Sequence, residues 1–294
     1  MTSDSSPGGL ARTEGQPRPV TGVVGGGTMG AGIAHVMLAA GARVRVVEVD
    51  AARVDAAHRS IAASLRRAAE RGAVADPEVL LGRLQVGDRI ELLSGCDPVV
   101  EALPEELTLK KELLARIEEV TADSALIATN TSSLSIGVLG AALRRRGRFL
   151  GLHFFNPVPA SALIEIVRAS ATEDSTVAQA RQWAELLGKE SIVVEDSPGF
   201  VTSRLGVIAG LEAIRMLEEG VASAEDIDRA MVLGYRHPMG PLRLTDLVGL
   251  DIRLNIAQYL SSTIGDRFRP PALLVDKVAA GELGKKVGRG FYEW

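Results

Sequence analysis

Short apolar runs alternate with helical periodicity over the first two-thirds of the chain. The apolar runs predict strands at 99–102, 125–129, 149–154, 163–167 and 191–194. Residues 51–71 form a long, charged segment of helical character, and residues 106–120 place leucine and isoleucine side chains on one helical face. Helices that alternate with short apolar strands are typical of a doubly wound α/β sheet. We therefore predict an α/β domain over residues 20–198.

The pattern changes after the segment Asp196-Ser-Pro-Gly-Phe200, where only helical periodicity continues. It predicts helices at 201–219, 224–233, 242–261 and 271–280, separated by Gly220, the 234–241 stretch and Gly281. A second, all-helical domain is therefore expected over residues 199–294. Its apolar faces are too extensive for a bundle of this size to cover, so we expect a homodimer formed through this domain.

Composition narrows the class of protein further. Residues 1–19 are rich in Ser, Gly and Pro and lack an apolar segment, which predicts a disordered tail and argues against a signal peptide. The net charge of −4 argues against a nucleic-acid partner, and no apolar run is long enough to predict a membrane span. The single Cys96 cannot form an internal disulfide, which fits a reducing, cytoplasmic location.

A glycine-rich loop lies between a strand ending at Val24 and a helix at 28–40, which Gly41 ends. Its residues Gly25, Gly27 and Gly30 match the spacing G-x-G-x-x-G. That spacing is weak by itself, but a second strand follows at 44–49 and completes the strand–loop–helix–strand unit that binds dinucleotides. The sequence therefore predicts a Rossmann-type domain with an NAD-type cofactor.

Each part of this unit has a physical role in binding a dinucleotide. Gly25 permits the tight turn, Gly27 lets the backbone approach the pyrophosphate, and Gly30 lets the helix pack on the strand. Glu48, at the end of the second strand, is the favoured acceptor for the ribose hydroxyls and would repel a 2′-phosphate, which favours NAD over NADP. Asp50 is the rival for this role, and the nearby Arg53 leaves NADP open.

Three polar features stand at predicted strands beyond the cofactor loop. Ser132 and His153 follow or end apolar strands, where ligands of doubly wound sheets bind, and Glu165 is a single carboxylate inside an apolar strand. Taken singly, Ser132 is also typical of a helix cap, His153 of a core histidine, and Glu165 of a residue that faces solvent. Together they suit hydride transfer from an alcohol, because a base must remove the hydroxyl proton.

Other chemistries find no support in the sequence. No segment resembles the G-x-S-x-G motif of serine hydrolases, and Ser132 lacks that strand-to-helix elbow. The four histidines are far apart along the chain, so we expect no metal site.

From about Val20 to Trp294, the chain resembles the short-chain L-3-hydroxyacyl-CoA dehydrogenases, which include 3-hydroxybutyryl-CoA dehydrogenases. The segments that carry this resemblance occur in the family's order, at 25–34, 130–134, 151–159, 198–200, 237–241 and 284–292. The resemblance implies a Rossmann-type N-terminal domain, an all-helical C-terminal domain, and reversible NAD-dependent oxidation of a 3-hydroxyacyl-CoA to a 3-ketoacyl-CoA.

The resemblance also implies site residues. Its catalytic set is Ser132, His153, Glu165 and Ser203. In this set His153 is the general base, Glu165 orients its ring and stabilises the imidazolium, and Ser132 hydrogen-bonds the reacting oxygen of the substrate. Cofactor contacts fall on Gly25, Gly26, Gly27, Thr28, Met29, Gly30, Glu48, Glu101, Glu106, Asn156 and Lys286. Coenzyme A contacts fall on Ser64 and Arg71, where an arginine suits phosphate groups.

The sequence departs from the family pattern at Ser203, where the family usually has Asn. A serine hydroxyl reaches less far than an asparagine amide, so we expect the substrate's thioester end to be held differently. Glu106 stands where an amide or an acid is usual. Two alternatives to an acyl-CoA substrate stay open: a hydroxyacyl group on an acyl carrier protein, and a free hydroxy acid such as a sugar acid. A non-catalytic, crystallin-like NAD-binding protein is disfavoured by the intact Ser132, His153 and Glu165.

Overall fold

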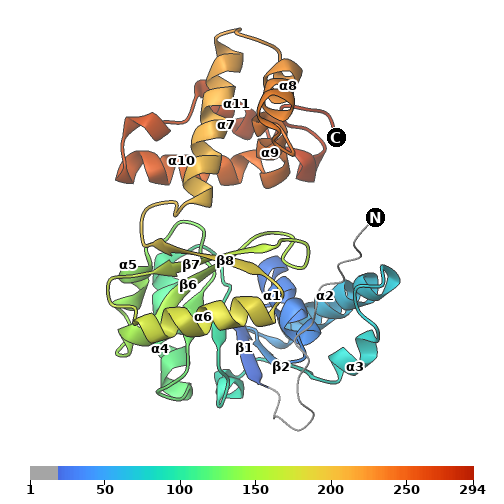
Figure 1. Cartoon of the computed structure of the whole chain (residues 1–294), viewed down its shortest axis with the longest axis vertical. Helices are drawn as coiled ribbons and strands as arrows, with labels where there is room; N and C mark the ends of the chain where they lie inside the picture. The colour runs from blue at the N-terminus through green and yellow to red at the C-terminus, as the bar shows by residue number, and fades with distance from the viewer. Residues whose placement is uncertain (1–18) are drawn as a thin grey trace, which may run out of the picture. The chain divides into compact units, whose positions relative to one another are not determined.

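The computed structural model describes residues 19–294, so the predicted tail over residues 1–19 lies outside the described residues except for Pro19. The chain forms two compact units, one ending at Asp196 and one comprising Ser197–Trp294. We call them the sheet unit and the helical unit, and Figure 1 shows the elements of each.

The sheet unit is built on one eight-stranded sheet in the order β3-β2-β1-β4-β5-β6-β7-β8. Its strands are β1 (Val20–Val24), β2 (Arg43–Val47), β3 (Leu84–Gly87), β4 (Val99–Glu101), β5 (Ile127–Thr129), β6 (Phe149–Phe154), β7 (Leu163–Arg168) and β8 (Glu190–Glu195). All neighbouring strands are parallel except β6 and β7, which pair antiparallel. The predicted doubly wound α/β class is confirmed.

Helices cover both faces of this sheet. They are α1 (Thr28–Ala39), α2 (Ala51–Glu70), α3 (Pro77–Leu81), α4 (Leu107–Val120), α5 (Ile136–Gly140) and α6 (Asp174–Leu186). Apolar side chains of α1, α2 and α6 share one core with alternate residues of the strands, and α1 and α2 lie side by side (Figure 1). The other strand positions face α4 and α5: Phe149 lies against Gly140, and Ile136 lies against Gly151. His153 belongs to this second face because side chains alternate along a strand.

The hydrophobic pattern does not predict four elements of the sheet unit, namely β3, α3, α5 and α6. Strand β3 is only partly buried, and α3 and α5 have five residues each, so these three elements show no strong hydrophobic periodicity. The strand predicted at 44–49 ends at Val47, which leaves Glu48 in the loop beyond the sheet edge.

The helical unit consists of α7 (Thr202–Glu218), α8 (Ala224–Tyr235), α9 (Pro241–Val248), α10 (Leu250–Thr263) and α11 (Ala272–Ala279), packed around one apolar core. The single helix predicted at 242–261 is wrong, because the structure has two. Gly249 separates them with a φ of 107°, a conformation that an L-residue rarely adopts and that ends α9.

Two buried aspartates connect segments of the helical unit through hydrogen bonds. Asp228 on α8 accepts hydrogen bonds from the backbone N–H groups of Leu242 and Arg243, both at 2.8 Å, and so satisfies the N-terminus of α9. Asp246 on α9 accepts from the backbone of Phe291 and Tyr292 and from the Trp294 indole, which ties the C-terminal segment to the core.

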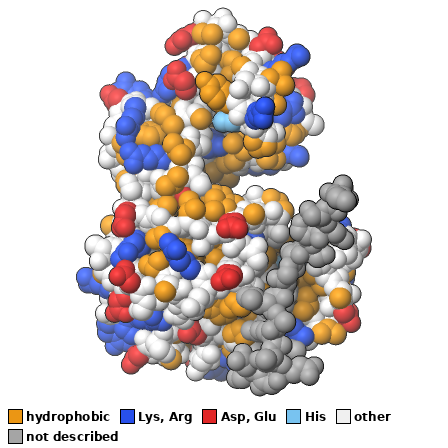
Figure 2. All heavy atoms as spheres, viewed as in Figure 1, with side chains coloured by type: hydrophobic (Ala, Val, Ile, Leu, Met, Phe, Trp, Pro, Cys, Tyr) orange, Lys and Arg blue, Asp and Glu red, His pale blue; other side chains and the backbone are white. Residues whose placement is uncertain are grey.

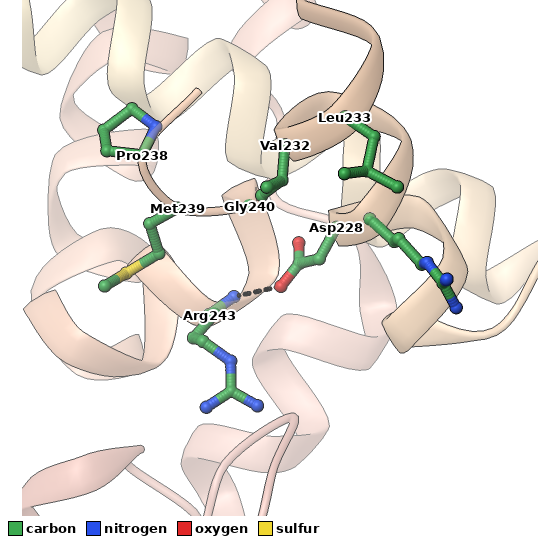
Figure 3. Close-up of a pocket in the computed structure, with 8 residues that line it drawn as sticks. Asp228, Val232, Leu233, Pro238, Met239, Gly240 and Arg243 are labelled. Atoms are coloured by element: carbon green, nitrogen blue, oxygen red, sulfur yellow. Dashed lines mark hydrogen bonds between the residues drawn. The ribbon is translucent and has the colours of Figure 1, made fainter. Parts of the chain in front are cut away.

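A shallow cavity of about 340 Å³ lies between α8 and α9 (Figure 3). Its walls are mainly apolar and include Val232, Leu233, Pro238 and Met239. Asp228 is the only carboxylate that lines it, and both of its oxygens already accept hydrogen bonds. The cavity therefore offers apolar surface rather than acid–base chemistry.

Candidate active site

The glycine loop is a backbone cradle at the edge of the sheet. Gly25 has a φ of 90°, which favours glycine, and its N–H donates to the Val47 carbonyl at 2.9 Å. A Cβ on Gly30 would collide with the Gly25 carbonyl oxygen, so helix and strand pack closely only with glycine there. A Cβ on Gly27 would meet no atom within 4 Å, so the space outside the loop is open. The loop thus has the shape that a pyrophosphate requires.

The N-terminus of α1 completes this cradle. Gly27 is its N-cap and provides no side-chain hydrogen bond, and the first turn contains no acidic residue. The first N–H groups and the positive end of the helix dipole are therefore left for an anion. The loop also lies beside the loop after β4, since a Cβ on Gly25 would approach the Ala102 carbonyl oxygen to 2.9 Å. Strand order reverses between β1 and β4, the place where doubly wound folds bind dinucleotides.

Glu48 and Asp50 have different surroundings. One oxygen of Glu48 accepts from the Gly26 N–H at 2.6 Å and the other from the Val49 N–H at 3.1 Å, so this carboxylate lies beside the glycine loop. It retains lone pairs for further donors such as ribose hydroxyls. Asp50 instead caps α2 by accepting from the Arg53 N–H at 2.8 Å. The geometry thus favours Glu48 over Asp50 as the ribose partner.

His153 and Glu165 form a buried pair on neighbouring strands. They are direct partners in the antiparallel register of β6 and β7, so their side chains project from the same face of the sheet. His153 Nδ1 lies 2.6 Å from Glu165 Oε2, and the two residues are 5% and 0% exposed. The Phe155 ring lies 4.5 Å from the imidazole, centroid to centroid. A carboxylate in this position selects the tautomer with a proton on Nδ1 and leaves Nε2 as the other ring nitrogen.

Ser132 lies in the loop that follows β5, next to the strand of His153. Glu105 holds this loop: its Oε1 accepts from the backbone N–H groups of Ser132 and Ser133 at 3.0 and 3.2 Å, and from the Thr131 hydroxyl. The strand ends at Thr129 and at Phe154 are joined because the Asn130 side-chain oxygen accepts from the Phe154 N–H at 2.9 Å. These contacts position the Ser132 loop at the same sheet edge as His153.

Glu101 has a structural environment that the sequence does not reveal. It is fully buried at the end of β4 and lies 2.7 Å from Lys110 Nζ, also fully buried on α4. Its oxygens also accept from the Leu103 N–H and the Thr129 hydroxyl, both at 2.6 Å. Every side-chain oxygen of Glu101 thus has a protein partner, and the ion pair ties the loop after β4 to α4.

Sequence reasoning missed three positioning residues, namely Glu105, Lys110 and Asn130. Lys110 had a usable signal, because it stands on the otherwise apolar side of the helix predicted at 106–120, where a lysine needs a carboxylate partner. Glu105 and Asn130 had none, since polar loop residues are common and their contacts join segments far apart in the sequence.

The predicted coenzyme A contacts lie on the C-terminal half of α2. Ser64 Oγ is 2.8 Å from Nδ1 of the buried His35, and Arg71 is exposed at the end of the helix. Burial lowers the pKa of His35, and the charges of Arg71, Lys189 and Arg67 lower it further. These three cations make the surroundings of His35 positive, as a phosphate-rich ligand requires.

The remaining predicted residues are divided between the two units. Glu106 and Asn156 are exposed in the sheet unit, at the start of α4 and after β6. Ser203 lies in the first turn of α7 in the helical unit. Lys286 belongs to the same unit, where its Nζ contacts both oxygens of Asp251 at 2.6 Å. Among residues 19–294, no three His, Cys, Asp or Glu side chains gather as metal ligands, and no helix is long and apolar enough to cross a membrane.

Comparisons with known proteins identify the family of this chain. Residues 20–197 match the model of the 3-hydroxyacyl-CoA dehydrogenase NAD-binding domain, and residues 199–294 match that of the C-terminal domain. The chain is 44% identical over 278 residues to a 3-hydroxybutyryl-CoA dehydrogenase of Mycobacterium tuberculosis, covering 93% of this chain and 97% of that one.

Solved structures give the same picture. The crystal structure of FadB2 from M. tuberculosis has a TM-score of 0.90 at 43% identity and covers 94% of this chain and 99% of its own. That of (S)-3-hydroxybutyryl-CoA dehydrogenase PaaH1 from Ralstonia eutropha has a TM-score of 0.89 at 40% identity and covers 95% and 99%.

A doubly wound NAD-binding unit followed by a helical unit defines a two-domain dehydrogenase. The chain belongs to the 3-hydroxyacyl-CoA dehydrogenase family. Its cofactor is NAD, which the open glycine loop, the uncapped end of α1 and Glu48 fit.

Proposed function

We propose that this protein oxidises the 3-hydroxyl group of a short-chain L-3-hydroxyacyl-CoA to the ketone, reversibly and with NAD. The observation that carries the proposal is the buried His153–Glu165 pair, with a 2.6 Å contact, in a chain of this family. NAD, when bound, supplies the acceptor for the hydride that leaves C3 of the substrate. The protein must then take up the hydroxyl proton.

His153 is the proposed base for that proton. Because Glu165 faces Nδ1, the other ring nitrogen, Nε2, is the atom that takes the proton from the substrate. The positive charge that forms on the imidazole is stabilised by the Glu165 carboxylate, so the pair acts most strongly as the reaction proceeds. Ser132 donates a hydrogen bond to the reacting oxygen, and Ser203 holds the thioester end.

The remaining contacts follow from the same proposal. The glycine loop, Glu48, Glu106, Asn156 and Lys286 contact the cofactor, while Ser64 and Arg71 contact the phosphates of coenzyme A. For Glu101 we propose support of the loop after β4 through Lys110 rather than a side-chain contact with the cofactor, because its oxygens already accept hydrogen bonds.

The test is an NAD-reduction assay with L-3-hydroxybutyryl-CoA, its pantetheine and acyl-carrier-protein thioesters, and the free acid. The coenzyme A thioester should have the highest kcat/KM, because Ser64 and Arg71 then contribute binding. A preference for the carrier-linked form or the free acid would replace the proposed substrate. His153→Gln should remove turnover while NADH binding, followed by fluorescence, is retained. If His153→Gln turns over substrate as fast as the wild type, another group is the base.

We further infer a homodimer formed through the helical unit. Most of the large apolar side chains exposed in residues 19–294 belong to this unit, including Leu233 at 68% and Tyr235 at 75% exposure, and Figure 2 displays apolar patches on its surface. A second copy is the occupant that would cover them. Sedimentation at micromolar concentration should give a dimer, and Leu233→Glu should shift it toward monomer. A wild-type monomer would refute the inference.

A cytoplasmic location is part of the same proposal. Cys96 is the only cysteine, it is buried, and burial raises the pKa of its thiol. A buried thiol of this kind is unreactive and suits a reducing compartment.

A further inference from the structure

Arg253 is a buried cation of the helical unit that lacks a carboxylate partner. It lies on α10, is 7% exposed, and its Nε is the only buried side-chain nitrogen or oxygen in the described residues without a hydrogen-bond partner. The two Nη groups of Arg253 also donate no hydrogen bond to any acceptor within residues 19–294. Only Nε is fully buried without a partner, so the Nη groups keep some contact with solvent. Burial lowers its pKa to about 10, so the group stays charged at neutral pH.

The surroundings on its own helix offer this guanidinium no anion. The residues three and four positions away along the chain are Gly249, Leu250, Ile256 and Ala257, none of them charged. The nearest carboxylate in the sequence, Asp251, is occupied by Lys286 Nζ at 2.6 Å from each oxygen. An unpaired, buried charge is unfavourable, so this arrangement leaves a ready site for a negatively charged group.

The position of the guanidinium links it to the proposed substrate contact. Arg253 Nη1 lies 3.1 Å from the point that a Cβ on Gly206 would occupy, so the guanidinium packs against α7 where glycine has no side chain. Gly206 is three residues after Ser203, and residues at this spacing are neighbours on one helix face. Three residues rise about 4.5 Å along a helix axis, so the guanidinium lies beside the helical turn that follows Ser203. A short acyl chain whose thioester end is held at Ser203 would extend toward this guanidinium.

We propose that Arg253 determines specificity by binding a carboxylate at the far end of the acyl chain. The favoured substrates are then coenzyme A monothioesters of 3-hydroxy dicarboxylic acids, whose terminal carboxylate pairs with the guanidinium through two parallel hydrogen bonds. This inference rests on the proposed function, in which Ser203 holds the thioester end. A carboxylate on a second copy of the chain is less suited, because Arg253 is already 7% exposed within a single chain.

The experiment compares two substrates of equal length, 3-hydroxyhexanoyl-CoA and 3-hydroxyadipyl-CoA, which end in a methyl group and a carboxylate. The wild type should favour the adipyl substrate in kcat/KM by about tenfold or more. In Arg253→Met that value should fall about 100-fold for the adipyl substrate and stay unchanged or rise for the hexanoyl substrate. Arg253→Lys should keep part of the preference, because the charge remains but the paired hydrogen bonds are lost. Arg269→Met, at an arginine whose side chain is 69% exposed on the same unit, should change neither value.

Thermal unfolding without substrate provides a second readout. Arg253→Met should unfold at a temperature equal to or above that of the wild type, because an unpaired buried charge is removed. A purely structural arginine would instead give a large drop in this temperature and equal losses with both substrates, and that result would overturn the proposal. A shift from dimer to monomer with an unchanged substrate ratio would overturn it in favour of a partner-chain carboxylate. Absence of turnover with 3-hydroxybutyryl-CoA as well would refute the proposed function rather than the role of Arg253.

Discussion

Replacement of Glu165 by glutamine tests the proposed chemistry most directly. The substitution keeps the size of the side chain and an oxygen acceptor for the Nδ1 proton, but it removes the negative charge 2.6 Å from His153. Both residues are almost fully buried, so water cannot replace the lost charge. In the proposed reaction the imidazole becomes positive as it takes the proton, and the carboxylate stabilises that form more than the neutral one.

The size of the effect follows from the burial of the pair. Removal of one partner of a buried ion pair costs about 3 to 5 kcal/mol. Glutamine has nearly the same shape as glutamate, so we expect the loss of transition-state stabilisation to lie at the lower end of this range. Since each 1.36 kcal/mol is a factor of ten, kcat should fall by about 10² to 10³. Binding of NAD should change little, because β7 is four strands from β1 and therefore about 19 Å from the start of the glycine loop.

The assay measures kcat by NADH formation and the dissociation constant of NADH by fluorescence titration, with the unfolding temperature as a check on folding. Glu190→Gln makes the same chemical change at an exposed position on the adjacent strand β8, and it should leave both quantities unchanged. If Glu165→Gln weakens NADH binding as much as it lowers kcat, or leaves kcat intact, then Glu165 does not act through His153.

Three further predictions concern stability and substrate contact. Gly240→Ala should lower the free energy of unfolding by about 1 to 3 kcal/mol in chemical denaturation, because the added Cβ would overlap Asp228. The control Gly234→Ala, in α8 with open space around it, should be neutral or stabilising. Equal effects of the two substitutions would contradict the packing argument. The lowered pKa of His35 means that the unfolded chain binds more protons, so stability should fall as the pH drops below about 6.5 and should fall less in His35→Gln; parallel pH curves would exclude this source. Ser203→Asn should preserve or raise kcat/KM with 3-hydroxybutyryl-CoA, because the longer amide still reaches the thioester end; a collapse of activity would show that Ser203 serves a different substrate geometry.

Much of the cofactor site could be predicted from local sequence. Gly25 and Gly30 are needed by the backbone itself, one for a positive φ and one for close packing, and such constraints act within a few residues. The limits of β6 at Phe149 and Phe154 were also predicted, because a fully buried strand is a continuous apolar run. The same reasoning failed at Gly249, since helical periodicity continues across a glycine that in fact separates two helices.

The sequence by itself determined the doubly wound class, the glycine loop and the identity of the polar residues at the strand ends. Only the tertiary structure decided which of these residues meet. The antiparallel pairing of β6 with β7 places His153 opposite Glu165. Helix α4 places the buried Lys110 next to Glu101, with which it forms an ion pair. The packing of α10 against α7 places the Arg253 guanidinium beside Gly206. Local propensity depends on near neighbours in the chain, whereas these contacts depend on strand register and helix packing between distant segments, which no local pattern encodes.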